Sequence, residues 1–246
     1  MRTTVATCCV FLLLWQAAVS TGLAPAAFLP APLAVLSAAG HLLASGIYFD
    51  DLAASMSRVL VAFGLSLALA LPLAYMAGTS YRMGGVILPL IGFFRYTPVA
   101  AFVPLCILWI GIGEPEKVAI IFIGTFFQLV VMLTDAVRAV PEEYYRVART
   151  LGGTRFQVLR DVTVPASASA IYDSLRLGLG WAWSYVVLAE LVAATTGVGY
   201  RLVEAQRFMR TADVFAGILL VGLVGLLLDV VLEYIKPVFF PWQTRR

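Results

Sequence analysis

The sequence predicts an all-α integral membrane protein with six transmembrane helices. Of its 246 residues, 61% are hydrophobic and only 13% are charged, whereas a soluble domain carries about 25% charged residues. Apolar stretches of about 20 residues, enough for a helix to cross a bilayer, recur along the chain. They are too long and too continuously apolar for barrel strands, and lipid admits only helices and closed barrels. We therefore expect residues 1–246 to form a single helical membrane domain.

The apolar stretches give the order of the six spans. The first also has the pattern of a signal peptide, because Arg2 precedes an apolar core that ends in Ala18-Val19-Ser20. Whether this span is retained stays open. After it, turn-forming residues lead into a short amphipathic segment near 33–45, which we expect at the membrane interface. The expected spans are about 4–20, 56–80, 85–110, 117–138, 166–193 and 213–236.

The distribution of basic residues predicts the orientation. Positively charged loops tend to stay in the cytoplasm, and with six spans ten basic residues fall on the side of the N-terminus against four on the other. Both termini and the long polar connection 139–165 are therefore expected in the cytoplasm. The ten are Arg2, Arg82, Arg138, Arg146, Arg149, Arg155, Arg160, Lys236, Arg245 and Arg246, and the four are Lys117, Arg201, Arg207 and Arg210.

The connection 139–165 has the features of a segment that folds. Pro141 followed by Glu142 and Glu143 predicts a helix start, because proline suits the first turn and the helix dipole favours acids there. This helix is expected to run to Leu151 and to end at Gly152-Gly153.

A second short helix is expected directly after the glycines. Thr154 and Gln157 have the spacing of a capping box, and Pro165 is expected to end the unit. Two short helices at a glycine corner would form a compact knob that fits a groove in a cytosolic partner. The alternative is an amphipathic helix pair that rests on the membrane surface.

The same connection resembles a known loop. The segments VARTLGG and VTVP resemble the EAA loop of bacterial ATP-binding-cassette (ABC) importer permeases of the binding-protein-dependent type I class. In that family the pattern is E-A-A, three residues, G, nine residues and I-x-L-P. Ala148, Gly152 and Val162-Thr163-Val164-Pro165 match at this spacing, whereas Arg146 stands in place of glutamate and Val147 in place of alanine.

The resemblance covers roughly residues 28–236 and points to one branch of the family. FLPAP, LWIGIG, LRLGLGWAW, GVGY and DVFAGILLVGLVGLLLD are similar to the nitrate, sulfonate, taurine and bicarbonate permeases. The resemblance implies a type I ABC importer permease fold with cytoplasmic coupling helices, in the bacterial inner membrane. It also implies ATPase docking through the loop, at Arg146, Val147, Ala148, Arg149, Leu151, Gly152 and Pro165.

The family also implies the partners and the mechanism. A permease of this kind pairs with a second copy, two ABC ATPase subunits and a periplasmic or lipid-anchored solute-binding protein, and it works by ATP-driven alternating access. ATP and Mg²⁺ belong to the ATPase, so the chain itself is expected to be no enzyme and to hold no cofactor or metal. Consistently, the sequence contains no glycine loop with the lysine and Ser/Thr of a phosphate-binding motif. The branch suggests a small oxyanion, a sulfonate or an organic acid as the solute.

Polar residues within spans are costly and are therefore candidates for the translocation path. For Arg95 the alternatives are pairing with a carboxylate or reaching the interface. For Glu190 a structural role is favoured, and it lies about 21 Å along one helix from Arg176, so each needs another partner. Trp181 is expected to pack or anchor at the interface. The path candidates are Arg95, Tyr96, Thr97, Gln128 and Glu190.

Other classes of protein are less consistent with the sequence. The sequence lacks the catalytic or metal-binding residues expected of an intramembrane enzyme, since His41 is the single histidine and no metal-ligand spacing is present. The formal net charge of +3 without a basic run gives no reason to expect nucleic-acid binding. A secondary transporter or channel remains the alternative, although no convincing internal repeat is seen. Substrate identity and the choice between homodimer and heterodimer stay open.

Overall fold

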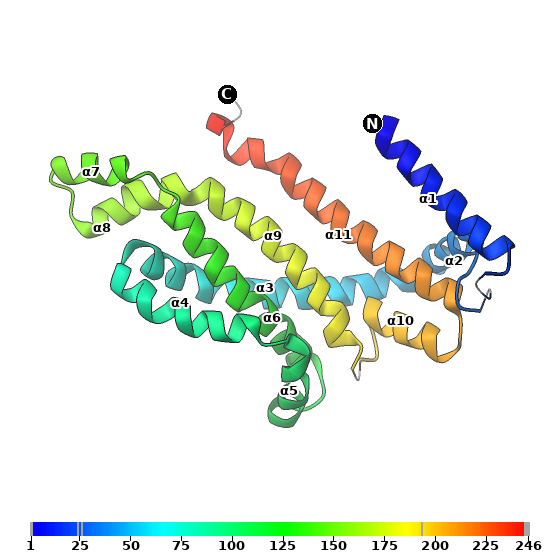
Figure 1. Cartoon of the computed structure of the whole chain (residues 1–246). Helices are drawn as coiled ribbons and strands as arrows, with labels where there is room; N and C mark the ends of the chain where they lie inside the picture. The colour runs from blue at the N-terminus through cyan, green and yellow to red at the C-terminus, as the bar shows by residue number, and fades with distance from the viewer. Residues whose placement is uncertain (1, 24, 26, 193, 244–246) are drawn as a thin grey trace. The chain divides into compact units, whose positions relative to one another are not determined.

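A computed structural model of the chain describes residues 2–23, 25, 27–192 and 194–243 (Figure 1). Residue 193, the expected end of the fifth span, and Arg245 and Arg246 of the cytoplasmic set lie outside these ranges. The all-α class is confirmed, since the described residues form helices and turns and no strand. They divide into two compact units, Met1–Met56 with Glu190–Leu226 and Ser57–Ala189 with Leu227–Arg246.

In the described part of the chain, three helices are each long and apolar enough to cross a membrane. They are α3 (Ile47–Thr79), α6 (Glu114–Arg138) and α11 (Thr211–Phe239). A fourth crossing is obtained if the bent pair of Tyr81–Tyr96 and Val99–Ile110 counts as one span. The count of six stays a prediction.

The first unit contains the N-terminal helices and the segment between α9 (Val164–Glu190) and α11. Its helices are α1 (Arg2–Ser20), α2 (Pro32–Ala44) and α10 (Val198–Arg207), together with the first parts of α3 and α11. Val35, Ala38 and Ala216 form its small apolar core. Trp15 packs against this core and donates its indole N–H to the Pro30 carbonyl at 3.0 Å, which ties α1 to the turn before α2.

The second unit is built around α6. Leu129, Val130 and Leu133 of α6 are fully buried. Small residues let α3 approach closely, since a Cβ on Gly78 would lie 2.5 Å from the Val137 side chain. The other elements are α4 (Tyr81–Tyr96), η1 (Val99–Phe102), α5 (Val103–Ile110), α7 (Glu142–Thr150), α8 (Arg155–Val158), the π-helical turn η2 (Leu159–Thr163), α9 (Val164–Glu190) and η3 (Pro241–Gln243).

The range 85–110 is divided in the structure. Helix α4 ends at Tyr96, and the pair formed with the following helical segment is bent by 87°. The bend lies at Pro98, whose ring disfavours helical backbone at the residue before it, and Thr97 is accordingly extended with φ −78° and ψ 127°.

Ion pairs join α9 to the second half of α11. Lys236 contacts both oxygens of Asp173 at 2.8 and 2.7 Å, and Arg176 contacts Asp229 at 2.5 Å. The Tyr172 hydroxyl also donates to a backbone carbonyl of α11, that of Leu232, at 2.7 Å. Arg176 therefore has the carboxylate partner that its position in an apolar helix requires.

Candidate translocation path and docking loop

The second unit contains a cavity of about 410 Å³ between α4, η1, α6 and α9. Arg95, Tyr96 and Thr97 line it from the end of α4, and Gln128 lines it from α6. The structure thus brings four of the five expected path residues together, because α4 packs against α6 and the chain bends directly after Tyr96. Glu190 is not among the residues that line the cavity.

Arg95 is the one charged residue in the described lining of this cavity. Its Nη2 donates to the Tyr96 hydroxyl at 2.9 Å, and its guanidinium lies 4.8 Å from the centre of the Tyr96 ring. Its Nε is buried without a hydrogen-bond partner. Within the described chain Arg95 has no carboxylate partner, so its charge and one donor remain available to an anion.

Aromatic rings form the opposite side of the cavity. Trp181 and Tyr185 of α9 line it, with ring centres 6.2 Å apart in a stacked arrangement, and Trp181 is 46% exposed. Sequence reasoning assigned Trp181 to packing or anchoring and did not select it. Their spacing of four residues predicts that both side chains lie on one face of the helix. The direction in which this face points depends on the contact of α9 with α6. A Cβ on Gly124 would lie 2.5 Å from the Tyr185 ring, so glycine is required at this contact.

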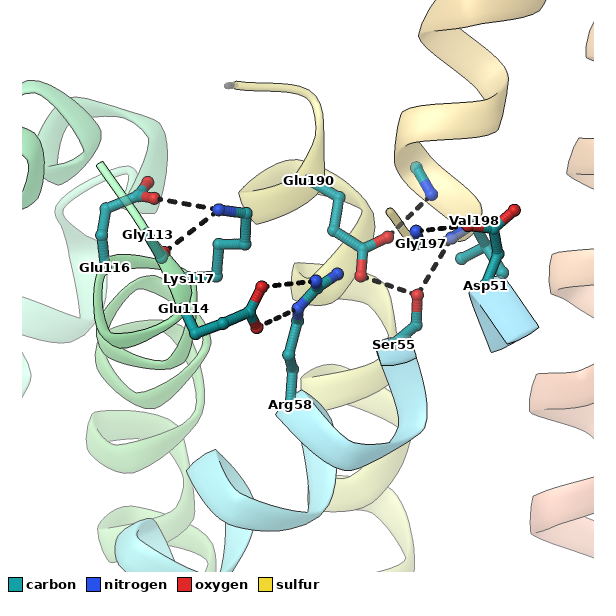
Figure 2. A network of polar contacts seen from close by, with 11 residues as sticks. Asp51, Ser55, Arg58, Gly113, Glu114, Glu116, Lys117, Glu190, Gly197 and Val198 are labelled. Atoms are coloured by element: carbon teal, nitrogen blue, oxygen red, sulfur yellow. Dashed lines mark hydrogen bonds and ion pairs between the residues drawn. The ribbon is translucent and has the colours of Figure 1, made fainter. Parts of the chain in front are cut away.

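Glu190 belongs to a buried hydrogen-bond network in the first unit (Figure 2). Its carboxylate accepts from the Ser55 hydroxyl at 2.6 Å and from the Gly199 N–H at 2.8 Å. Ser55 in turn accepts from the Val198 N–H at 3.0 Å, and Asp51 accepts from the Gly197 N–H at 2.8 Å. Three N–H groups at the start of α10, which lack partners inside the helix, are thus satisfied by side chains of α3 and α9. The helix dipole also favours these carboxylates.

Arg201 extends this network on α10. It pairs with Asp51 and, at 2.8 Å, with Glu204. Burial by itself lowers the pKa of the Arg201 guanidinium. Asp51 and Glu204 each raise this pKa through a hydrogen bond and a negative charge, and together they outweigh burial. The pKa of Arg201 is therefore raised above its ordinary value. Sequence reasoning missed Asp51, Ser55 and Arg201, because their partners are distant in the chain.

We expect Gly197→Ala to disrupt this network. Gly197 has φ +117° and ψ 164°, a conformation almost restricted to glycine, and a Cβ there would collide with the Glu190 carboxylate. The backbone conformation alone costs other residues about 1–3 kcal/mol. The unfolding midpoint of the purified chain in nanodiscs should fall by about 5 °C or more.

Gly222→Ala on α11 is the matched control for this substitution. A Cβ on Gly222 meets nothing within 4 Å, and alanine is the better helix former. Its midpoint should equal or exceed that of the wild type. Equal midpoints for Gly197→Ala and Gly222→Ala would show that the network contributes nothing to stability.

A glycine motif closes the first helix of the connection 139–165. Gly153 N–H donates to the Ala148 carbonyl and Gly152 N–H to the Arg149 carbonyl, both at 3.0 Å. This is the Schellman arrangement, which needs a left-handed residue after the helix, and Gly152 supplies it with φ +79°. The expected glycine corner is confirmed, and α7 ends at Thr150, one residue before the expected position.

The second helix begins with the expected capping box. Gln157 N–H donates to the Thr154 hydroxyl, and Thr154 N–H donates to the Gln157 side chain at 2.9 Å. The expected end at Pro165 is wrong, because the chain continues from α8 through η2 into α9 without a break. Proline lacks an N–H and its ring crowds the preceding turn of a helix. Here a π-helical turn precedes Pro165, and in it the Val164 N–H donates to the Leu159 carbonyl. This wider turn accommodates the proline ring.

The expected docking residues lie on or beside this hairpin of α7 and α8. Arg146, Val147, Arg149, Leu151, Gly152 and Pro165 are exposed, and Ala148 is half-buried. Arg146, which replaces the glutamate of the resembled pattern, pairs with Glu142 at 3.0 Å one turn earlier. Such an exposed ion pair stabilises the helix by at most about 0.5 kcal/mol. Arg146 can therefore leave Glu142 for another carboxylate at little cost.

Comparisons with known proteins agree with this architecture. The family "Binding-protein-dependent transport system inner membrane component" matches residues 70–240. A protein of Brucella abortus (strain 2308), described as a probable ABC transporter permease protein, is 37% identical over 94% of this chain and 91% of its own length. The taurine transport system permease protein TauC of Escherichia coli (strain K12) is 32% identical over 97% of this chain and 89% of its own length.

A solved structure shares the fold. An inward-facing structure of the MetNI methionine ABC transporter is similar with a TM-score of 0.69 at 14% identity, over 79% of this chain and 96% of that chain. Together these findings set aside the secondary transporter or channel. The chain belongs to the binding-protein-dependent transport system inner membrane component family, and it is a permease subunit of an ABC importer.

Proposed function

We propose that the chain forms, as a homodimer, the path of an importer that docks its ATPase subunits through the α7–α8 hairpin and passes a small anion along Arg95. A solute-binding protein delivers the anion on the outer face. The ATPase binds ATP and Mg²⁺ and performs the hydrolysis, so the chain needs no cofactor of its own. The observation that carries the docking role is an exposed apolar stripe on this otherwise polar hairpin.

The apolar stripe consists of Tyr144, Val147, Leu151 and Phe156, which are 52%, 61%, 82% and 68% exposed. Tyr144, Val147 and Leu151 follow the three- and four-residue spacing of one helix face. Exposed apolar side chains that gather in one place mark contact sites. The Schellman motif and the capping box fix the shape of the hairpin before it binds, which reduces the entropy lost on docking.

The charge of the hairpin separates docking from the alternative of resting on the membrane. A helix that lies on a membrane combines a basic polar face with a deeply apolar one. Helix α7 instead places Glu142 and Glu143 beside its arginines, and its exposed large apolar side chains are Tyr144 and Val147. This mixed surface suits a protein groove better than anionic lipid.

The cavity supports an anion as the solute. Arg95 is the one charged residue in its described lining, and the cavity volume of about 410 Å³ admits an organic molecule as well as an inorganic ion. One relative is a taurine transport permease, and taurine carries a sulfonate. We therefore propose a sulfonate, another small oxyanion or an organic acid, held by Arg95 with hydrogen bonds from Tyr96, Thr97 and Gln128.

Co-purification with a co-expressed ABC ATPase subunit tests the docking role. The wild type should retain the ATPase through affinity purification in lipid nanodiscs, whereas Leu151→Gln should lose about 90% of it, because burying one leucine is worth about 1.5–3 kcal/mol. The matched control is Leu33→Gln on α2, a leucine that is 77% exposed. If the wild type retains no ATPase, or if both variants retain it equally, the docking role is wrong.

A further inference from the structure

The cytoplasmic loop borders a large open hollow in the second unit. The hollow has a volume of about 1100 Å³ and lies between the α3–α4 junction and the α7–α8 hairpin. We call it the basic hollow, because three arginines from three different helices line it. Its lining residues are Thr79, Ser80, Tyr81, Arg82, Tyr145, Arg149, Gly153, Arg155, Phe156, Val158, Leu159 and Thr163.

The three arginines of the basic hollow have no partners for their charges. The guanidinium groups of Arg82, Arg149 and Arg155 form no hydrogen bond or ion pair within the described residues, and no carboxylate lines the hollow. The other two arginines of the connection 139–165 are paired, Arg146 with Glu142 at 3.0 Å and Arg160 with Asp161 at 2.7 Å. Unpaired cations are thus concentrated at the hollow.

The folding of the loop produces this concentration. Arg149 lies in the last turn of α7, and Arg155 opens α8 just after the glycine corner. The Schellman motif and the capping box fix the corner between them, and Arg82 comes from the first turn of α4. Like charges held around one hollow repel, so their arrangement is most favourable when an anionic partner fills it.

We propose that the basic hollow receives carboxylate side chains of the ATPase subunit, which pair with Arg82, Arg149 and Arg155 when the hairpin docks. The proposal rests on the docking role proposed above. Guanidinium groups bind carboxylates with two parallel hydrogen bonds, which gives direction as well as attraction. The ATPase that fits this permease should therefore present an acidic groove.

The double substitution Arg149→Glu with Arg155→Glu tests the proposal in nanodiscs that contain only phosphatidylcholine. We expect the wild type to retain its co-expressed ATPase and the double variant to retain at least about tenfold less, since a charge pair that becomes repulsive is strongly unfavourable at an interface. Arg149→Lys with Arg155→Lys keeps the charges and should lose less. Arg207→Glu, an exposed arginine of α10, is the matched charge control and should retain the ATPase fully.

Salt gives an independent measurement on the wild type. Raising NaCl from about 0.15 to 1 M shortens the screening length from about 8 to 3 Å and should weaken retention of the ATPase. Full retention by the double glutamate variant, or salt-independent retention by the wild type, would overturn the acidic-groove proposal and leave the docking role intact. A loss seen only in nanodiscs with anionic lipid would assign the hollow to lipid headgroups and would overturn it as well. If the wild type itself retains no ATPase, the docking role fails first.

Discussion

Arg95→Met is expected to reduce transport by about 10- to 100-fold without loss of the assembled complex. Among the described residues, Arg95 is the one charged side chain lining the cavity between α4, α6 and α9, and its Nε is buried without a hydrogen-bond partner. A hydrogen bond to a charged group is worth about 1.5–3 kcal/mol, which corresponds to that range of rates. Uptake should be measured in proteoliposomes with the co-expressed ATPase and a solute-binding protein, using whichever of labelled taurine, methanesulfonate and nitrate the wild type transports.

Two variants distinguish charge from packing in this experiment. Arg95→Lys keeps the cation but loses the planar group, so it should restore part of the transport. Gln128→Glu places a carboxylate in the cavity lining and should reduce transport of an anion even though Arg95 is present. ATPase retention should be unchanged in all three variants. Wild-type uptake by Arg95→Met would contradict the path role of this residue.

Local features of the fold could be predicted from the sequence because their causes are local. The capping box needs only Thr154 and Gln157, and the corner after α7 needs only a glycine with positive φ. The four residues that line the cavity were selected because a polar group in an apolar segment is costly, which is a property of composition. Their convergence depends on the bend at Pro98, and the proline itself is visible in the sequence.

Features that depend on distant partners could not be predicted. Nothing near Glu190 in the sequence indicates that Ser55 and the start of α10 surround it. The position of Trp181 in the cavity lining also depends on a distant contact, because Gly124 against Tyr185 sets the rotation of α9 against α6. The end expected at Pro165 failed for another reason, since proline is tolerated in a helix when a π-helical turn precedes it.

The continuity of α8 with α9 connects the two candidate sites in one element. From Phe156 at the hairpin to Trp181 at the cavity, the uninterrupted helical segment is about 38 Å long at about 1.5 Å per residue. A displacement of the docked hairpin therefore acts on the aromatic side of the cavity through one helix. The pairs Asp173–Lys236 and Arg176–Asp229 join this helix to α11, so both helices should move together.

Lys236→Asp is expected to uncouple ATP hydrolysis from transport. The substitution sets two carboxylates against each other at Asp173 and separates α11 from α9, where Lys236 is now 2.7 Å from Asp173. An unpaired charge costs about 2.5–3.5 kcal/mol at the centre of a bilayer and less toward its surface, and 1.4 kcal/mol already corresponds to a factor of ten. The ATP hydrolysed per anion transported, measured in the same proteoliposomes, should rise about tenfold.

Exchanging the charges of the two residues tests whether the ion pair itself, rather than contact between the two side chains, couples ATP hydrolysis to transport. Asp173→Lys combined with Lys236→Asp restores the attraction with reversed polarity and should return the ATP consumed per anion toward the wild-type value. Tyr172→Phe removes the neighbouring hydrogen bond to Leu232 without a change in charge, so it should leave this ratio nearly unchanged. If the exchange fails to restore coupling although the complex assembles, or if Lys236→Asp hydrolyses no extra ATP, α9 transmits the movement without help from α11.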